Sequence, residues 1–254
     1  MNRASFERIA PPVFTFVIGV ALAELLIRGL GVSPLILPRP SAVLAAAIGE
    51  SASLLPALAA TGRAVLLGLL LSSTVGVAAA VALASSPWVQ RAFYPYAIFF
   101  QIVPIVAIAP LLVIWFGFGA TTVRASAFIV SLFPILANTL TGLEETDPLL
   151  KEMFLLYKPP KWKMIFKLQI PSAIPYILTG LRISVGLATI GAIVGEFIAG
   201  GGLGSLIDSA RTQQRVDLVF SGVLASSVLA LLLVLAIDLV SGLLLRRRPY
   251  TRSS

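Results

Sequence analysis

Long uncharged runs dominate the chain and predict helices that cross a membrane. Four of them reach or exceed the ~18–20 residues that a helix needs to span the hydrocarbon layer. These runs are Ala64–Gln90, Ala92–Val123, Ala125–Leu143 and Leu218–Ile237. Two further segments, Pro12–Ile27 and Pro175–Ala199, carry only one and two charged residues. Because the runs are apolar on every side, they lack the alternation of a membrane barrel. The pattern predicts an all-α polytopic membrane protein with six transmembrane helices.

The division of the chain follows from these runs. We expect a single transmembrane domain over residues 1–254, with an N-terminal helix at 12–30, core helices within 61–245 and a cytoplasmic loop at 144–171. Pro95, Pro104 and Pro110 can kink the third helix. On the outer side, Pro40 is placed to begin a short helix through Ala42–Ile48 within the loop Gly29–Ala60.

Composition supports a membrane protein and narrows its chemistry. Hydrophobic residues make up 58% and charged residues 12% of the chain, against roughly 25% charged residues in soluble domains. Cysteine and histidine are absent, which removes disulfides, most zinc sites and every catalytic group that needs imidazole. No serine–lysine motif or carboxylate pair stands out. We therefore expect a protein that is not an enzyme and that binds no metal or cofactor itself.

The basic residues predict the orientation. With the N-terminus in the cytoplasm, twelve of the nineteen lysines and arginines lie inside and four outside, as the positive-inside rule requires. The inner ones are Arg3, Arg8, Arg91, Lys151, Lys158, Lys161, Lys163, Lys167, Arg246, Arg247, Arg248 and Arg252, and the outer ones are Arg28, Arg39, Arg211 and Arg215. Both termini are then cytoplasmic, and the net charge of +8 reflects topology, not nucleic-acid binding. Alternatively, the first helix is a signal peptide cleaved near Ala21-Leu22-Ala23.

The inner loop, Glu144–Pro171, is the one long charged segment predicted on the cytoplasmic side. Asp147 and Pro148 favour a helix start, and apolar residues then recur at helical spacing. The helix should stop at Lys158, before Pro159 and Pro160, and a second helix, Lys161–Gln169, should run to Pro171. From the residues alone, this helix pair either docks into the groove of a partner protein or lies on anionic lipid.

The spacing of this loop resembles the loop motif of ATP-binding-cassette (ABC) import permeases. That motif reads Glu-Ala-Ala, three residues, Gly, nine residues, Ile, one residue, Leu, Pro. Here the same spacing gives Glu152-Met153-Phe154, then Lys158 in place of the glycine, then Leu168-Gln169-Ile170-Pro171.

Four flanking motifs are similar to the nitrate, sulfonate, taurine and pyrimidine-precursor branch of the same family. They are Leu37-Pro38-Arg39-Pro40-Ser41-Ala42-Val43, Pro110-Leu111 with Trp115-Phe116-Gly117-Phe118-Gly119, Thr179-Gly180-Leu181-Arg182-Ile183, and Gly195-Glu196 with Gly202-Leu203-Gly204.

The resemblance implies a type I importer permease fold in the bacterial inner membrane and an assembly of several chains. The expected partners are two cytoplasmic ATPases, a second permease copy that forms a homodimer with this chain, and an extracytoplasmic solute-binding protein. ATP and Mg belong to the ATPase, since this chain has no phosphate-binding loop motif. The expected contact with the ATPase consists of Asp147, Glu152, Met153, Phe154, Tyr157, Lys158, Pro159 and Pro160. The solute is expected to be a small organic or inorganic anion or a vitamin-precursor-like compound.

Polar residues inside the spans are candidates for the solute path. In the fifth helix, polar residues and glycines recur at intervals of three or four from Thr179 to Glu196, which places them on one face. Arg182 and Glu196 lie about 21 Å apart along a helix, so each needs another partner. The path candidates are Gln101, Ser131, Asn138, Arg182, Thr189 and Glu196. The alternative is a helix interface at which Gly186, Gly191 and Gly195 allow close approach.

Two other classes of protein compete with an importer permease. An ion-coupled secondary transporter or a channel should carry more ionisable groups in mid-membrane and often an internal repeat. A membrane enzyme would have to rely on serine, lysine or carboxylate chemistry. Both fit the residues less well than a permease driven by a separate ATPase.

Overall fold

The computed structural model describes residues 3–246, and throughout that range the regular structure is helical with no strand. The elements are α1 (Arg3–Gly29), α2 (Pro40–Gly49), α3 (Ser51–Ala84), α4 (Pro87–Ile102), α5 (Ile105–Phe116), α6 (Ala120–Glu144), α7 (Pro148–Leu156), α8 (Lys161–Met164), the π-helix η1 (Ile165–Gln169), α9 (Ile170–Ala199), α10 (Gly202–Thr212) and α11 (Val216–Arg246). The all-helical prediction is confirmed. Arg247, Arg248 and Arg252, predicted to be cytoplasmic, lie outside the described residues.

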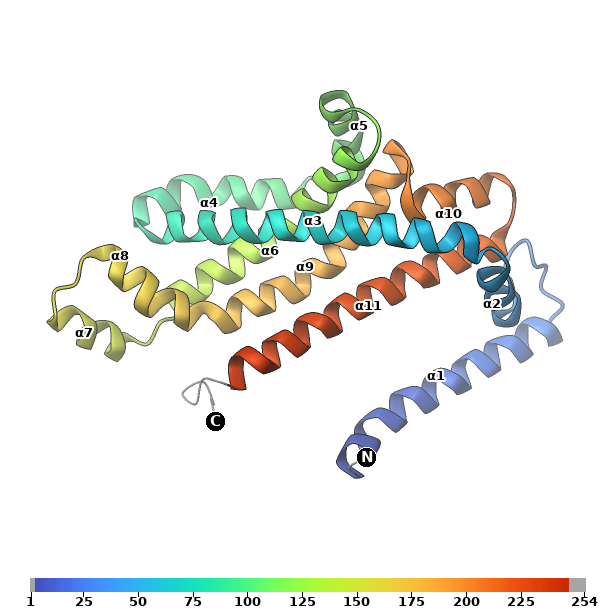
Figure 1. Ribbon diagram of the computed structural model, residues 1–254, viewed down its shortest axis with the longest axis horizontal. Coiled ribbons are helices and arrows are strands. Elements are labelled where there is room, and N and C mark those ends of the chain that lie inside the picture. The colour runs from blue at the N-terminus through green and yellow to red at the C-terminus, as the bar shows by residue number, and fades with distance from the viewer. Residues whose placement is uncertain (1–2, 247–254) are drawn as a thin grey trace.

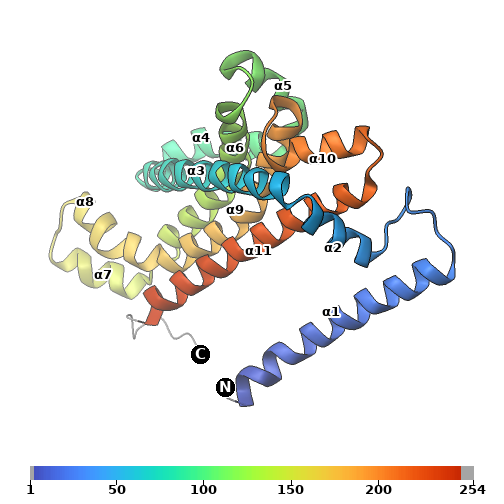
Figure 2. The same ribbon diagram turned by 45° about the vertical axis from the view of Figure 1, so that its right-hand side comes forward.

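Five helical segments of the described chain are long and apolar enough to cross a membrane. They are Ala10–Gly29, Ser51–Ala84, Ala120–Glu144, Lys161–Ala199 and Val216–Leu245. These segments make up the long axis of the molecule, with α7 and α8 at one end and α2 and α10 at the other (Figure 1). The view in Figure 2 keeps the same two groups at opposite ends.

The third predicted span, Ala92–Val123, is not one kinked helix, so that prediction was wrong. It is divided into α4 and α5, each too short to count as a span by length alone. The break falls at Val103, whose backbone is extended because the following Pro104 disfavours the helical conformation. Gly117 and Gly119 then reverse the chain with φ values of +77° and +100°, which favour glycine. Pro104 and the two glycines therefore determine this corner.

Two further boundaries differ from the sequence prediction. The outer short helix forms as α2 with Pro40 in its first turn, but α3 already begins at Ser51, so the predicted loop is shorter. The second loop helix does not end at Pro171, because α8, η1 and α9 are continuous. A π-turn directly precedes this proline, and the wider turn makes room for its ring.

The core is formed where α6 packs between α3 and α9. Glycines allow the close approach: a Cβ on Gly191 would lie 2.7 Å from the Ser126 carbonyl oxygen, and one on Gly180 would lie 2.9 Å from that of Pro134. Gly186, in contrast, faces open space. Hydroxyls join the three helices, since Ser131 Oγ donates to Ser72 Oγ at 2.8 Å and Ser184 Oγ to the Ser131 carbonyl at 2.8 Å.

A buried carboxylate joins three helices at the end that carries α10. Glu196, 2% exposed, lies on α9; Thr61 Oγ1 on α3 is 2.8 and 3.0 Å from its two oxygens. The Gly204 amide of α10 donates to the carboxylate at 2.8 Å, and the Leu203 amide donates to Thr61 Oγ1 at 2.9 Å. An anion at a helix N-terminus satisfies amides that have no partner in the helix. A Cβ at Gly202 (φ +62°) would overlap this carboxylate, which explains the glycine.

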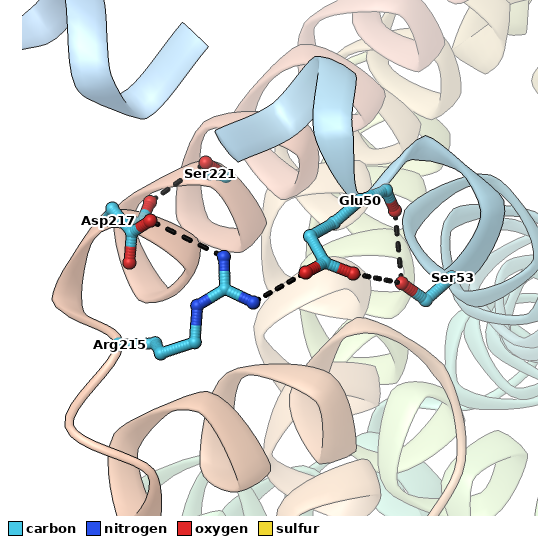
Figure 3. A network of polar contacts seen from close by, with 5 residues as sticks. All are labelled: Glu50, Ser53, Arg215, Asp217 and Ser221. Atoms are coloured by element: carbon cyan, nitrogen blue, oxygen red, sulfur yellow. Dashed lines mark hydrogen bonds and ion pairs between the residues drawn. The ribbon is translucent and has the colours of Figure 1, made fainter. Parts of the chain in front are cut away.

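A second polar network joins the neighbouring helices α2, α3 and α11 (Figure 3). Arg215, just before α11, pairs with Glu50 at the junction of α2 and α3 and with Asp217. The bond from Arg215 holds the pKa of the Glu50 carboxyl below its usual value, so the pair is charged at neutral pH. Ser221 Oγ lies 2.8 Å from the Val43 carbonyl oxygen of α2. The network therefore holds α2 against the start of α11.

Replacing Glu196 with glutamine tests how much the thermal stability of the permease depends on this carboxylate. Glutamine keeps the shape but places an amide NH₂ against the Thr61 or Gly204 donors, at a cost of about 1–3 kcal/mol for an unsatisfied buried group. We expect the midpoint of thermal unfolding of the purified protein in detergent to fall by several degrees. Glu152→Gln, at an exposed carboxylate of α7, is the control and should leave the midpoint unchanged. Equal midpoints for the two variants would contradict the role assigned to Glu196.

Candidate functional site

Helix α7 presents an apolar surface that the rest of the described chain leaves uncovered. Its start is as predicted: Asp147 Oδ1 accepts a hydrogen bond from the Leu149 amide at 2.8 Å, and Pro148 occupies the first turn. None of its residues is buried, and Leu156 and Tyr157 are 81% and 86% exposed. The other exposed apolar side chains are Leu149, Leu150, Met153 and Leu155. A concentration of exposed apolar residues on one short helix is typical of a binding surface.

The turn after α7 has a strained backbone. Lys158 adopts φ +46°, a conformation that costs an L-residue about 1–2 kcal/mol and that glycine adopts freely. This is the position at which the import-permease motif has glycine. Pro159 and Pro160 follow and hold the chain extended until α8 begins at Lys161. Lysine in place of glycine therefore adopts the positive φ of this turn at an energetic cost.

The loop that carries α7 is tied to the ends of the membrane helices. Gln90 Nε2 of α4 donates to Glu144 Oε1 at 2.6 Å, and Lys151 Nζ donates to the Glu144 carbonyl at 2.8 Å. Gln169 and Tyr176 add longer bonds of 3.4 Å to the Leu143 carbonyl and to Glu145 Oε2. Lys151 joins α7 to the end of α6, and Gln90 of α4, Gln169 of η1 and Tyr176 of α9 bond to the same end of α6. The end of α6 is therefore the point at which α7 is connected to the core helices.

The structure gives Arg182 a partner that sequence reasoning missed. Its guanidinium lies 3.3 Å from Asp238 Oδ2 of α11, and the two side chains remain 60% and 39% exposed. Both residues lie in membrane-spanning segments. An ion pair facing lipid is costly, so this face must meet water, headgroups or other protein. The sequence signal that could have indicated this pair is that Arg182 and Asp238 are each an isolated charge in an otherwise apolar stretch.

The other candidates for the path do not gather in one place. Gln101 is exposed, and Asn138 Nδ2 donates to the Pro134 carbonyl at 2.8 Å. Ser131, Thr189 and Glu196 are buried within the protomer. Thr189 borders a pocket of about 300 Å³ between α9 and α11, whereas Glu196 borders one of about 340 Å³ beside Phe118 and the glycine turn. The predicted polar face of α9 is thus divided between its exposed and buried sides.

Comparison with known proteins agrees with this arrangement. Residues 72–249 match the family described as binding-protein-dependent transport system inner membrane component. The formylaminopyrimidine transport permease protein ThiX of Halalkalibacterium halodurans is 34% identical over 245 residues, covering 96% of this chain and 97% of the relative. The taurine transport system permease protein TauC of Escherichia coli is 29% identical, covering 81% of this chain and 78% of the relative.

A solved structure shares the fold. The MetNI methionine ABC transporter, in an inward-facing conformation, contains a chain that superposes with a TM-score of 0.63 at 15% sequence identity, covering 74% of this chain and 94% of that one. The motifs, the helical architecture and the family match agree. The chain belongs to the binding-protein-dependent transport system inner membrane components, the multi-pass permease subunits of ABC importers, which are not enzymes themselves.

Proposed function

We propose that α7 is the element through which a cytoplasmic ATPase drives this permease. The observation that carries the proposal is the uncovered apolar surface of α7, combined with the bond from Lys151 of α7 to the end of α6. The residues of the contact are Asp147, Glu152, Met153, Phe154, Tyr157, Lys158, Pro159 and Pro160, joined by Leu156, the most exposed aliphatic residue of α7. Asp147 acts by fixing the helix start and Lys158 by setting the turn.

The complete importer in this proposal has two permease copies of this chain, two ATPases and an extracytoplasmic solute-binding protein. Both termini and α7 face the cytoplasm, and α2 and α10 face outward. Import alternates between outward-open and inward-open states as ATP binding draws the ATPases together and moves the α7 helices. ATP and Mg are bound by the ATPases.

The solute in this proposal is a small heterocyclic compound of the formylaminopyrimidine type. The support is the relative named for that solute, which matches nearly the whole chain at higher identity than the taurine permease does. A small anion such as a sulfonate is the second candidate, favoured by the taurine relative. Uptake of labelled compounds by cells that express the permease with its ATPase and binding protein distinguishes the two.

The solute path in this proposal follows the exposed side of α9. Arg182, held by Asp238, faces the aqueous path, and Gln101 of α4 is an exposed polar candidate on another helix. Asn138 of α6 lies against Gly180 on the packed side of α9 and acts by fixing the two helices. Ser131, Thr189 and Glu196 act from behind this surface by fixing the helices that form it.

Substituting Leu156 with aspartate tests the docking of α7. A charge at the most exposed aliphatic residue of α7 should prevent burial against the ATPase, so we expect at least a tenfold loss of co-purified ATPase. Trp88→Asp, an exposed apolar position on α4, is the matched control and should retain the ATPase. If both variants retain it equally, α7 lies on lipid instead and is not the dock.

Substitutions of Lys158 test the turn. Because glycine adopts the positive φ without strain, Lys158→Gly should raise the thermal stability of the permease and preserve ATP hydrolysis stimulated by the loaded binding protein. Lys158→Ala removes the same charge but keeps the strain, so it serves as the control and should show no such gain. If glycine and alanine behave alike, the charge at this position matters and the turn does not.

Single cysteines can test the path, since the chain contains none of its own. Thr179→Cys, one turn before Arg182 on its exposed side, should react with a membrane-impermeant charged thiol reagent when the importer is reconstituted. Leu239→Cys lies beside Asp238, hence at the depth of Arg182, but on an exposed apolar position, and it should stay unmodified. An unreactive Thr179→Cys would place this face against lipid or another helix.

A further inference from the structure

Two arginines inside the membrane-spanning helices have no partner for their charge. Arg63 of α3 is the one charged residue between Glu50 and Arg91, and Arg124 of α6 is the one between Arg91 and Glu144. Both are exposed, and neither takes part in an ion pair or a side-chain hydrogen bond within the described residues. A charge in an apolar span is costly, so each of these guanidinium groups needs water or a counter-ion.

The other arginines of the chain are in a different situation. Within the candidate spans, Arg28 pairs with Glu24 and Arg182 with Asp238. Arg39 and Arg91 are also exposed and unpaired, but they lie outside the candidate spans. An unpaired cation within a span is therefore specific to α3 and α6.

The packing of α3 on α6 places the two arginines at the same level. The two helices run in the same direction, and the contacts between them keep one register, with partners 59 residues apart in sequence. These contacts are Gly68 with Ala127, Ser72 with Ser131, and Gly76 with Ile135. In this register Arg63 lies opposite Thr122, and Arg124 lies opposite Val65. The two arginines thus differ in height by two residues, about 3 Å at the rise of a helix.

The same register places both arginines on one side of the helix pair. The next contact position toward α10 is Ala64 with Val123, which belong to one core cluster. Arg63 directly precedes Ala64, and Arg124 directly follows Val123. Because successive residues turn in the same sense around two parallel helices, the position before the contact on α3 and the position after it on α6 point to the same side. The two positions on the opposite side are fully buried: Val65 and Thr122.

Helix α4 covers this side of the pair only in the half near α7. Residues of α4 pack in one cluster with Leu136 and Leu140, which lie on the same side of α6 as Arg124. Helix α4 then ends at Ile102, and α5 instead accepts a hydrogen bond from Thr122 on the opposite side. The described chain therefore leaves the level of the two arginines uncovered.

A cavity of about 340 Å³ begins one helical turn beyond the arginines, toward α10. Ala60 and Ala120, which line it, lie three and four residues before Arg63 and Arg124. Glu196 also borders this cavity, but its oxygens are already bonded by Thr61 and by the Gly204 amide. The cavity gives a small molecule a way to the arginines from this end of the protein.

A second copy of the chain offers these arginines no free carboxylate. At the end that carries α2 and α10, and along the spans, the carboxylates already have partners within the chain: Glu24 with Arg28, Glu50 and Asp217 with Arg215, Asp208 with Arg211, Asp238 with Arg182, and Glu196 with Thr61 and Gly204. A further group lies at the opposite end, around α7: Glu144, Glu145, Asp147 and Glu152. The counter-ion of the two arginines therefore comes from outside the permease.

We propose that Arg63 and Arg124 together bind one oxyanion, such as a sulfate, sulfonate or phosphate group. The axes of packed helices lie about 8–10 Å apart, a distance across which two arginine side chains can reach a common ligand. Guanidinium groups donate paired hydrogen bonds to such oxyanions. An anion between two like charges also removes their mutual repulsion.

The oxyanion belongs either to a soluble anion that arrives through the cavity or to a phospholipid headgroup, and the experiment below separates these sources. The site itself is independent of the function proposed above. The identification of a soluble anion with the transported solute rests on that function and favours its sulfonate-like candidate.

Chemical modification of arginine in the full-length permease tests the site. The protein is reconstituted in phosphatidylcholine nanodiscs and treated with phenylglyoxal, in sulfate or in chloride at equal ionic strength. A second sample, in phosphatidylglycerol nanodiscs, receives chloride alone. Peptide mass spectrometry gives the rate at each arginine. A bound oxyanion should slow the modification of Arg63 and Arg124 several-fold, whereas the exposed and unpaired Arg39 is the control and should react at an unchanged rate. Slowing by sulfate assigns a soluble anion, and slowing by phosphatidylglycerol without sulfate assigns a lipid headgroup.

Reciprocal variants test whether the two arginines share one ligand. Arg124→Gln should abolish the protection of Arg63, and Arg63→Gln should abolish that of Arg124, because a single guanidinium holds the anion weakly. Lysine at either position should keep part of the protection. Arg39→Gln removes an unpaired cation outside the spans, so it is the matched control and should leave both arginines protected. Gel filtration checks that each variant remains folded.

Four results would overturn the proposal. The first is that neither sulfate nor phosphatidylglycerol slows the two arginines, and the second is that Arg39 is slowed equally. The third is protection that survives in the reciprocal variants. The fourth is a failure of Arg63 and Arg124 to react even in chloride and phosphatidylcholine, which would show that a second copy covers them. None of these readouts involves the ATPase, so failure here is distinct from failure of α7 docking.

Discussion

The arrangement of the end that carries α10 depends on the carboxylate of Glu196, which is buried and has no cationic partner among the described residues. An isolated charge in such a place is strongly disfavoured unless hydrogen bonds compensate for lost hydration. Here the compensation comes from Thr61 and from the Gly204 amide at the start of α10. The carboxylate therefore has hydrogen-bond donors for its own oxygens, caps the start of α10 and joins α3, α9 and α10. Gly202 is constrained by it, since a side chain at that position would occupy the place of the carboxylate.

The two ends of the molecule are stabilised in different ways. At the end that carries α2 and α10, carboxylates from Glu24, Glu50 and Glu196 bind the short helices or their junctions through polar contacts within the chain. At the opposite end, α7 has no buried residue and exposes apolar side chains. A short helix of nine residues gains little stability from its own hydrogen bonds in water. Its conformation is thus held by its cap, its turn and its attachment to the spans, and its apolar surface is left for a partner.

The sequence allowed most of the helices and the start of α7 to be predicted, because apolar runs and the Asp147-Pro148 pair act locally. The prediction failed where the backbone conformation of one residue breaks a helix, as at Val103 before Pro104. It also failed where a helix continues across a proline, as at Pro171. Helix α10 was missed because its polar composition and glycine-rich start look like a loop. Thr61 and Glu196 are 135 residues apart, and only tertiary packing brings them together. The positive φ of Lys158 likewise has no local signal beyond the glycine of the motif.

The division of α9 into two sides connects these observations to transport. One side packs on α6 through Gly180, Gly191 and Gly195, so closely that no side chain would fit between the backbones. Such packing resists sliding, because displacement of either helix would bring the backbones into overlap. The other side, with Thr179 and the Arg182–Asp238 pair, is open. Since α9 is continuous with η1 and α8, the coupling proposed above would carry a displacement beside α7 along α9 and, through this packing, to α6. On that proposal the open side changes its surroundings while the packed side does not.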